Sequence, residues 1–395
     1  MRELLEAELG GPSVFRDVAK LGFDYVPDAL PGRDEEYRQL ARALKPILQS
    51  PQGQHLMLTG PVGSGKTALT KRFCTDFKAL AGKQGVNVEW VHVNCRRRST
   101  EAAALLEILQ HFDDRFPDRG FSNSEMLGVL RKQLDRRKAQ LVVALDEADV
   151  LLKKSGSDLV YNLTRFHEED THPETSISLL LVSQGDARQH LDEAARSTFK
   201  RANTIDLRRY TAEGLQAIVH QRVGLAFHSA AFPETLEELV ADAAAVEGDA
   251  RYSIELLQKS GQLADDDGRP KVTAEDVRAA VAETHPFVES SKLRELTPHH
   301  RYTLLAIARA LKKGDAAYAI TGDVEKRYAL VCEEHGDKPR AHTQFWTYLK
   351  ELTDLGLIAS KRSGKGVLGT TTLISLPDVP ATVLERKLLE MQKSA

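Results

Sequence analysis

The sequence predicts an α/β fold, because short apolar runs alternate with segments whose apolar residues recur at helical spacing. Leu40, Leu44 and Leu48 show such spacing, as do Leu105 and Leu109. Strands separated by helices indicate a parallel sheet covered on both faces. Five runs have the length of strands: His55–Thr59, Val88–Asn94, Leu141–Leu145, Ile177–Val182 and Asn203–Leu207.

Two further domains are predicted after this sheet. From Thr211 to about Thr284 helical patterns follow one another without strands, which indicates a small helical domain. After the polar stretch Glu289–Glu295, three helices and a hairpin follow in the order of a winged-helix domain. Their predicted bounds are Tyr302–Leu311, Val324–Glu333 and Thr343–Leu355 for the helices, and Leu357–Lys361 and Val367–Leu376 for the strands. We therefore divide the chain into an N-terminal extension (1–22), an α/β core (23–209), a helical domain (210–288) and a winged helix (289–395).

The composition is typical of a soluble intracellular protein, with 42% hydrophobic and 28% charged residues. No stretch approaches the roughly 18 apolar residues of a membrane span, and Met1–Gly10 does not resemble a signal sequence. Cys74, Cys95 and Cys332 are too widely spaced for a disulfide framework or a zinc site. We expect a cytoplasmic, nucleoid-associated protein without a membrane partner.

The net charge of -3 divides unevenly along the chain. From Ser291 onward, 17 Lys or Arg face 12 Asp or Glu, a net of +5; subtraction from 54 and 57 leaves 37 and 45, a net of -8, before it. A basic end is compatible with a nucleic-acid partner, although mixed charge is usually only a solvated surface.

The segment after the first strand fits the P-loop pattern G-x-x-x-x-G-K-[ST]. It follows the apolar run Leu56–Leu58 and precedes a helix predicted at Ala68–Lys78. Glycines let backbone N–H groups point at phosphates, and the helix N-terminus adds positive potential. Lys66 is expected at the β- and γ-phosphates of ATP or ADP, and Thr67 at Mg²⁺. The predicted nucleotide contacts here are Gly60, Pro61, Val62, Gly63, Ser64, Gly65, Lys66, Thr67 and Ala68.

A second motif is the apolar strand Leu141–Leu145, which ends in Asp146 and Glu147. Asp146 is expected to hold the water shell of Mg²⁺, and Glu147 to position or activate the attacking water. A strand can end in two carboxylates without any chemistry. Together with an upstream P-loop, however, the pair indicates ATP hydrolysis.

These segments resemble AAA+ ATPases, and among them the archaeal replication initiators related to the origin recognition complex and its cell-division-control partner. Four further matches support the resemblance: Tyr25–Arg33 at the adenine-side entry, Val93–Arg96 at the second strand and the turn after it, Tyr161–Arg165 after the carboxylate strand, and Gly248–Arg251 as the sensor 2 motif. The resemblance implies a five-stranded AAA+ core, a helical lid and a winged helix. It places the adenine-side contacts at Tyr25, Val26, Pro27, Arg33, Tyr210 and Ile218, and brings Arg251 to the γ-phosphate.

Two positions depart from this family. Sensor 1 is usually asparagine, and here the position is Gln184, whose amide sits on a longer stem. The arginine finger expected from a neighbouring copy aligns with Ala194, while Arg196 lies two residues on. Arg196 either acts in trans or is a surface arginine. Because such a finger can contribute about 10³ to 10⁵ in rate, we expect slow or partner-dependent hydrolysis.

The winged helix carries the expected DNA contacts. Lys338–Ala341 leads into the recognition helix, on which Phe345, Leu349 and Leu352 form the core face. Trp346 lies off that apolar stripe, so a role in the core and a role in DNA contact both stay open. The basic, glycine-containing turn Ser360–Gly366 is either a wing on the phosphate backbone or a solvated turn. The predicted DNA contacts are Thr343, Gln344, Trp346, Thr347, Lys361, Arg362 and Lys365, with Arg115 and Arg119 added by the resemblance for the region Glu101–Phe121.

These features lead to the hypothesis of an ATP-dependent protein that recognises origins on double-stranded DNA and helps to load the replicative helicase. Other copies of the chain or paralogues are further expected partners. Two alternatives stay open: a regulatory or signalling ATPase with a winged helix, and a DNA-binding module that holds ADP with negligible turnover.

Overall fold

The computed structural model describes residues 11, 13–166, 175–199, 203–284, 293, 295–312, 316–362, 371–377 and 379–393. The contacts between residues divide the chain into two compact units. One unit consists of Val26–Tyr210 and Gly248–Ala250. The other consists of Met1–Tyr25, Thr211–Glu247 and Arg251–Ala395. The four-part division expected from the sequence stays a prediction.

The first unit is built on a parallel sheet of five strands in the order β2-β3-β4-β1-β5. This confirms the predicted sheet. Thr59 lies opposite Ser183, and Asp146 lies opposite Asn94 and Val182, so the strands end at a common edge. The strands are β1 (His55–Thr59), β2 (Val88–Asn94), β3 (Gln140–Asp146), β4 (Ser176–Ser183) and β5 (Thr204–Asp206).

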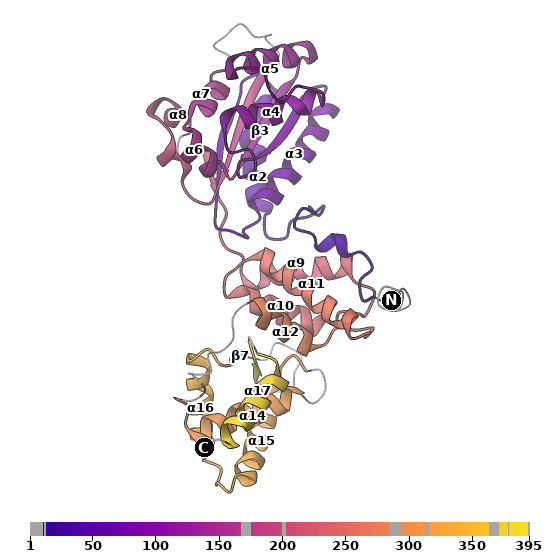
Figure 1. Ribbon diagram of the computed structural model, residues 1–395, viewed down its shortest axis with the longest axis vertical. Coiled ribbons are helices and arrows are strands. Elements are labelled where there is room, and N and C mark those ends of the chain that lie inside the picture. Colours follow the sequence, from indigo (N-terminus) through magenta and orange to yellow (C-terminus); the bar gives the residue numbers. More distant parts are fainter. Residues whose placement is uncertain are drawn as a thin grey trace. The chain divides into compact units, whose positions relative to one another are not determined.

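Helices cover both faces of this sheet (Figure 1). The interior strand β3 is buried along its whole length. Its residues Leu141, Val143 and Leu145 pack with the α4, α5, α6 and α7 side, and Val142 and Ala144 with the α2 and α3 side. Because successive strand residues point to opposite faces, an unbroken apolar run is needed here. The helices are α2 (Asp34–Leu44), α3 (Lys66–Lys83), α4 (Glu101–Phe112), α5 (Asn123–Arg137), α6 (Ala148–Ser155), α7 (Asp158–Thr164) and α8 (Glu193–Thr198), with the 3-10 turns η2 (Lys45–Leu48) and η4 (Ala187–His190).

The second unit contains a helical lid, as the periodicity predicts. Its helices are α9 (Ala212–Ala226), α10 (Glu234–Ala245), α11 (Ala250–Asp266) and α12 (Ala274–Thr284). Part of the expected N-terminal extension, including η1 (Val18–Leu21), packs on these helices. The Phe15 ring lies 4.8 Å from that of Phe227, and the Val14 N–H donates to Asp265 at 2.6 Å.

The same unit ends in a winged helix. It contains α14 (Pro298–Lys312), β6 (Ala319–Ile320), α15 (Thr321–Glu334), α16 (His342–Asp354), β7 (Ala359–Arg362), β8 (Thr372–Ser375) and α17 (Ala381–Lys393). Leu357 and Ile358 are buried ahead of β7 rather than paired in it, so the predicted first strand began too early. The sequence prediction also lacked β6, which is only two residues long, and α17, which buries Leu384 and Leu388.

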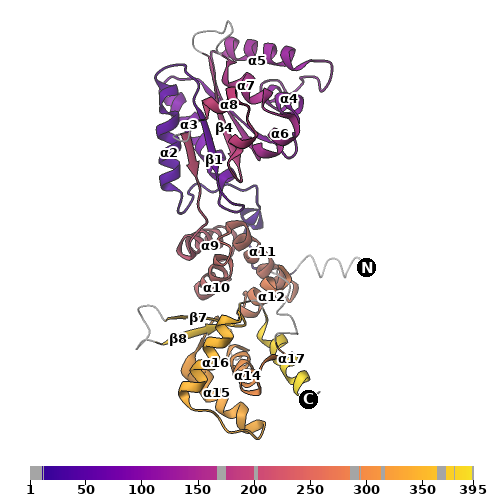
Figure 2. The same cartoon turned by 90° about the vertical axis from the view of Figure 1, so that its left-hand side faces the viewer.

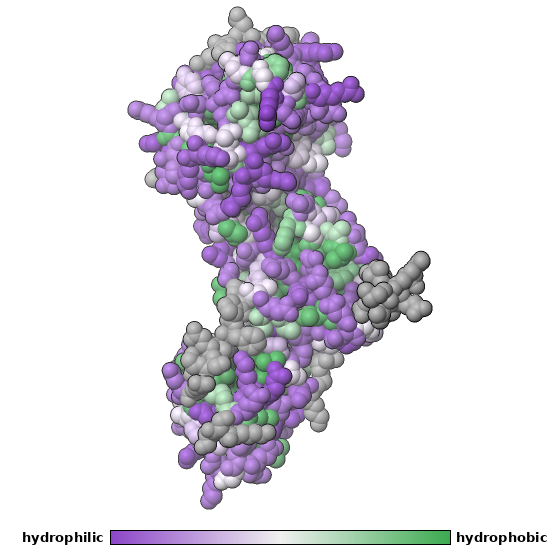
Figure 3. Space-filling view, viewed as in Figure 1, coloured by the Kyte–Doolittle hydropathy of each residue, from purple (hydrophilic) through white to green (hydrophobic). Residues whose placement is uncertain are grey.

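No described helix is long and apolar enough to cross a membrane. Hydrophilic residues predominate on the face shown in Figure 3, and the apolar ones are scattered in small groups.

Candidate nucleotide-binding site and winged-helix surface

The P-loop joins β1 to α3 in a backbone conformation that requires glycine. Gly60, Gly63 and Gly65 have φ of 151°, 73° and 87°. A Cβ on Gly63 would lie 1.8 Å from Asp249 Oδ1, and one on Gly65 would lie 2.9 Å from the Tyr210 hydroxyl. Protein atoms therefore line the loop so closely that a side chain at these positions would displace it.

Lys66 is the first residue of α3, which places it at the positive end of the helix. Its ammonium donates to the carbonyl oxygens of Gly60 at 2.7 Å and Pro61 at 2.8 Å. The lysine is thus folded back over the loop that it follows. Val62 and Ser64 lie in the loop before α3, and Thr67 and Ala68 lie in its first turn. Their predicted contacts with a nucleotide stay predictions.

Arg33 packs against the P-loop and is only 5% exposed. Its Nε donates to the Ser64 carbonyl at 3.0 Å, and a terminal nitrogen donates to the Arg208 carbonyl at 2.7 Å. The guanidinium also lies 3.9 Å from the centre of the Tyr210 ring, and burial raises the pKa of that tyrosine. Two residues expected on the adenine side are therefore in contact with each other and with the loop.

Asp146 and Thr67 meet at the sheet edge, where the Thr67 hydroxyl donates to Asp146 Oδ2 at 2.7 Å. Asp146 is 4% exposed. Burial acts to raise its pKa, but hydrogen bonds from His92 and Thr67 outweigh burial and hold the pKa below the usual value. The carboxylate is therefore ionised at neutral pH. A hydroxyl and a carboxylate oxygen are the hard donors that suit Mg²⁺.

Glu147 follows in a left-handed backbone conformation, with φ of 55°. This is unusual for a residue with a side chain and is often found at functional sites. Its carboxylate accepts from Arg96 Nε at 2.7 Å. Arg96 was noted in the sequence only as part of a family motif, and its pairing with Glu147 was not predicted.

Three predicted catalytic features remain: Gln184, Arg196 and the sensor 2 segment. Gln184 directly follows β4 and is exposed, beside the strand ends that carry Thr59 and Asp146. Arg196 is exposed on α8, and its guanidinium donates to the Leu191 carbonyl at 2.8 Å. The Ala250 N–H donates to the Gly63 carbonyl at 3.2 Å, so the sensor 2 segment reaches the P-loop.

Other predicted contacts are divided between the two units. Val26 and Pro27 belong to the P-loop unit, whereas Tyr25, Ile218 and Arg251 belong to the other unit. Within that unit the Tyr25 carbonyl accepts from Arg222 at 3.2 Å. The roles predicted for these residues toward a nucleotide stay predictions.

The winged helix presents the predicted face of α16. Thr343, Gln344, Trp346 and Thr347 are exposed, whereas Phe345, Leu349 and Leu352 are buried. The Trp346 indole donates to His342 at 2.9 Å. A groove of about 530 Å³ separates α16 from β7 and β8, and Figure 2 shows these elements side by side. Lys350, Lys361 and Arg362 are among the residues that line it.

The basic residues expected on DNA differ in their surroundings. Arg362 is exposed, but Lys361 is engaged by the lid: its ammonium lies 2.8 Å from Asp242 Oδ2 and 3.1 Å from Glu238 Oε1. Lys365 lies outside the described residues. Arg115 and Arg119 are exposed in the segment between α4 and α5, and only the first part of the region Glu101–Phe121 is helix.

Three family models match consecutive parts of the chain. An AAA domain matches residues 50–191, a Cdc6 AAA+ ATPase-type lid domain matches residues 216–282, and a CDC6 C-terminal winged helix domain matches residues 291–386. Together with the P-loop and the buried carboxylate at the end of β3, they define a nucleotide-binding AAA+ ATPase with a lid and a winged helix.

Comparison with known proteins identifies the family within this class. The chain is 32% identical over 367 residues to an ORC1-type DNA replication protein of Saccharolobus solfataricus, covering 90% of this chain and 89% of that one. It belongs to the family of ORC1-type DNA replication proteins.

Two solved structures are similar along almost the whole chain. The Cdc6p crystal structure from Pyrobaculum aerophilum has a TM-score of 0.82 and 27% identity, covering 97% of this chain and 99% of that one. The ORC1 protein of Aeropyrum pernix, solved in complex with DNA, has a TM-score of 0.62 and 31% identity, covering 95% and 97%.

The glycine requirement of the P-loop can be tested with Gly65→Ala. A left-handed alanine costs about 1–2 kcal/mol, and its Cβ would press on Tyr210, so we expect nucleotide affinity to fall by about tenfold or more. Titration with a fluorescent ADP analogue measures this. Gly82→Ala is the control, because Gly82 lies in the same helix with open space around its Cβ. Wild-type affinity of Gly65→Ala would contradict the assigned loop geometry.

Proposed function

We propose that this chain recognises replication origins on double-stranded DNA and helps to load the replicative helicase, and that bound ATP or ADP controls its grip on DNA. The observation that carries this proposal is the combination of a complete P-loop and carboxylate site with an exposed winged-helix groove in one chain of the ORC1-type family. That a similar ORC1 protein was solved with DNA supports the assignment.

In this proposal the P-loop N–H groups and Lys66 bind the phosphates. Thr67 and Asp146 are the residues that would hold Mg²⁺, which supplies positive charge to the transferred phosphoryl group when bound. No group of three or more His, Cys, Asp or Glu among the described residues could hold a metal alone. This agrees with Mg²⁺, which usually takes its other ligands from phosphates and water.

Glu147 is proposed to orient the attacking water, with Gln184 and Arg251 sensing the γ-phosphate. The adenine side would be formed by Tyr25, Val26, Pro27 and Ile218. A neighbouring copy would present Arg196 to the site in trans.

Hydrolysis is proposed to be slow. Arg96 donates to one oxygen of the Glu147 carboxylate and so competes with a water for it. The same pair favours a second candidate function, in which the chain binds DNA with retained ADP and negligible turnover.

Glu147→Gln separates these two functions. If Glu147 positions water, removing its charge should lower single-turnover ATP hydrolysis by about 10²-fold or more while nucleotide affinity changes little. Glu107→Gln is the matched control, because Glu107, which lies on α4, also pairs with an arginine, Arg98. Equal rates in wild type and Glu147→Gln would favour the ADP-retaining module instead.

DNA binding can be tested by footprinting on chromosomal fragments. We expect wild-type protein to protect origin-proximal repeats in preference to other sequences. Arg362→Gln should weaken binding to all fragments similarly and reduce the salt dependence by about one phosphate contact, because phosphate contacts carry no sequence information. Lys83→Gln, which removes the same charge from α3, should leave both unchanged. The absence of any preferred origin fragment would overturn the proposed function.

A further inference from the structure

The carboxylate of Asp146 is held from the neighbouring strand β2 by a histidine that the sequence did not single out. His92 Nε2 lies 3.0 Å from Asp146 Oδ2. An aspartate carboxylate only accepts hydrogen bonds, so the Nε2 nitrogen of His92 carries the proton and donates it. His92 reaches Asp146 because β2 and β3 are paired in parallel register, with Asn94 opposite Asp146.

The hydrogen bonds that the Asp146 carboxylate accepts indicate the role of His92. Oδ2 accepts from the Thr67 hydroxyl and from His92, and Oδ1 accepts from the Glu147 N–H at 3.0 Å. A carboxylate has about four acceptor positions, so one remains, on Oδ1. The Thr67 hydroxyl donates its hydrogen bond to Asp146, which leaves its oxygen lone pairs for a cation. His92 therefore fixes which oxygen of Asp146 faces the cation position.

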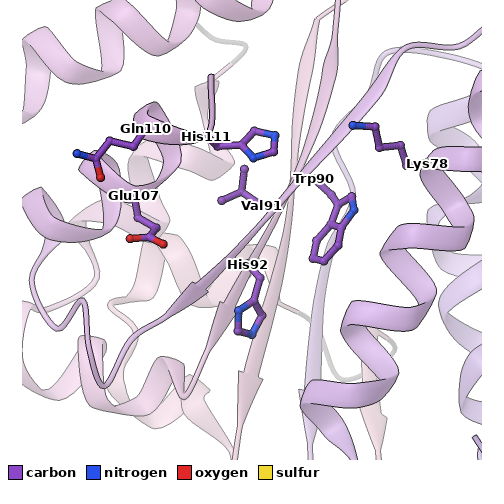
Figure 4. Close-up of a pocket in the computed structure, with 7 residues that line it drawn as sticks. All are labelled: Lys78, Trp90, Val91, His92, Glu107, Gln110 and His111. Carbon is purple, nitrogen blue, oxygen red and sulfur yellow. The ribbon is translucent and has the colours of Figure 1, made fainter. Parts of the chain in front are cut away.

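The position of His92 suits such a role. Its side chain is 17% exposed and lines a groove of about 460 Å³ along the edge strand β2. Figure 4 shows His92, Trp90 and His111 around this groove. His111 faces Glu89 at 3.4 Å rather than Asp146, so the chain offers a second histidine in the same groove without the same contact.

We propose that His92 is a positioning residue of the magnesium nucleotide site, acting through Asp146. This inference rests on the proposed function. Residues that orient a metal ligand usually change metal affinity or activity by about 10–100-fold when replaced. The effect of His92 should therefore appear in the magnesium dependence of nucleotide binding, not in binding as such.

The experiment compares ADP affinity with Mg²⁺ and with excess chelator. We expect His92→Leu to weaken binding about 10–100-fold in Mg²⁺ and by less than about threefold in chelator. His92→Gln places an amide donor near the same point and should recover most of the loss. His111→Leu is the control, with no change in either condition. Thermal unfolding in chelator checks that each variant is folded.

The outcomes distinguish a failure of the proposed magnesium site from a failure of the positioning role of His92. If wild-type affinity does not depend on Mg²⁺, the proposed magnesium site itself is wrong. If wild type depends on Mg²⁺ and His92→Leu depends on it equally, the positioning role of His92 is wrong. If His92→Leu fails to fold, a His92→Gln variant with the affinity of wild type in Mg²⁺ supports the role, and one weakened tenfold or more overturns it.

An independent observation concerns the contact between the lid and the wing strand β7. The Lys361 ammonium lies 4.0 Å from the centre of the Tyr318 ring, and the Tyr318 hydroxyl donates to Asp242 Oδ2 at 2.7 Å. Asp242 thus accepts a hydrogen bond from Tyr318 and pairs with Lys361, and Glu238 also pairs with Lys361. Burial and the neighbouring Asp242 raise the pKa of Tyr318, so this hydroxyl keeps its proton.

A buried arginine fixes the same two domains beside this cluster. Arg278 on α12 is 1% exposed and donates to the carbonyl oxygens of Ala316 at 2.9 Å and Ala317 at 3.0 Å. These residues directly precede Tyr318. Burial lowers the pKa of Arg278, yet Glu275 lies 2.6 Å away and compensates its charge. The lid acids are therefore held at the wing by more than a surface ion pair.

Lys361 also lines the groove between α16 and the wing strands. A DNA phosphate that used this lysine would have to compete with two carboxylates. We propose that Glu238 and Asp242 form an autoinhibitory lock that restrains Lys361, and that DNA binding with full strength requires its release. This proposal also rests on DNA binding by the winged helix.

The lock is tested by DNA affinity and its salt dependence in the Glu238→Gln, Asp242→Asn double variant. We expect affinity to rise about 3–10-fold and the salt slope to increase by about one, because one more lysine becomes available to phosphate. In a Lys361→Gln background the same pair of changes should have little effect. Glu234→Gln, which removes a charge from the same helix, is the control.

If wild type binds no DNA, the proposed function fails. If wild type binds DNA but the double variant binds no better, the lock fails. An equal gain with Lys361→Gln would also overturn the lock, because the gain would then come from general charge rather than from the released lysine.

Discussion

The hydrogen bond between Thr67 and Asp146 is the contact on which the nucleotide site depends. It joins residues 79 positions apart, at 2.7 Å, and requires that the P-loop and the end of β3 arrive at the same sheet edge. That arrival is fixed by the register of β4, which pairs with β1 at Thr59 and with β3 at Asp146. Burying an ionised carboxylate is unfavourable unless it is hydrogen-bonded, so three donors surround it.

Much of this core could be predicted from the sequence. The strands His55–Thr59 and Val88–Asn94 have the predicted bounds, because apolar runs and flanking polar residues mark a buried strand clearly. The P-loop and Asp146 were found because their chemistry demands fixed residue types at fixed spacing.

The contacts between distant elements could not be predicted in the same way. His92 and Arg96 lie on or next to an ordinary strand, and only the register of β2 against β3 brings them to Asp146 and Glu147. Lys361 looked like a free wing charge, because nothing in its own segment reveals two acids on α10. Side-chain partners across the fold leave no local periodicity that the sequence could show.

The buried guanidinium of Arg33 has a mechanical consequence. It bridges the carbonyl of Ser64 in the P-loop and the carbonyl of Arg208, which stands three residues before the lid begins at Thr211. Its planar fork is stiff and cannot follow one carbonyl without pulling on the other. A displacement of the P-loop would therefore act, through Arg33, on the segment that follows β5. Lysine, with its single flexible ammonium, would leave this linkage slack, so a change that preserves the charge would still uncouple the two segments.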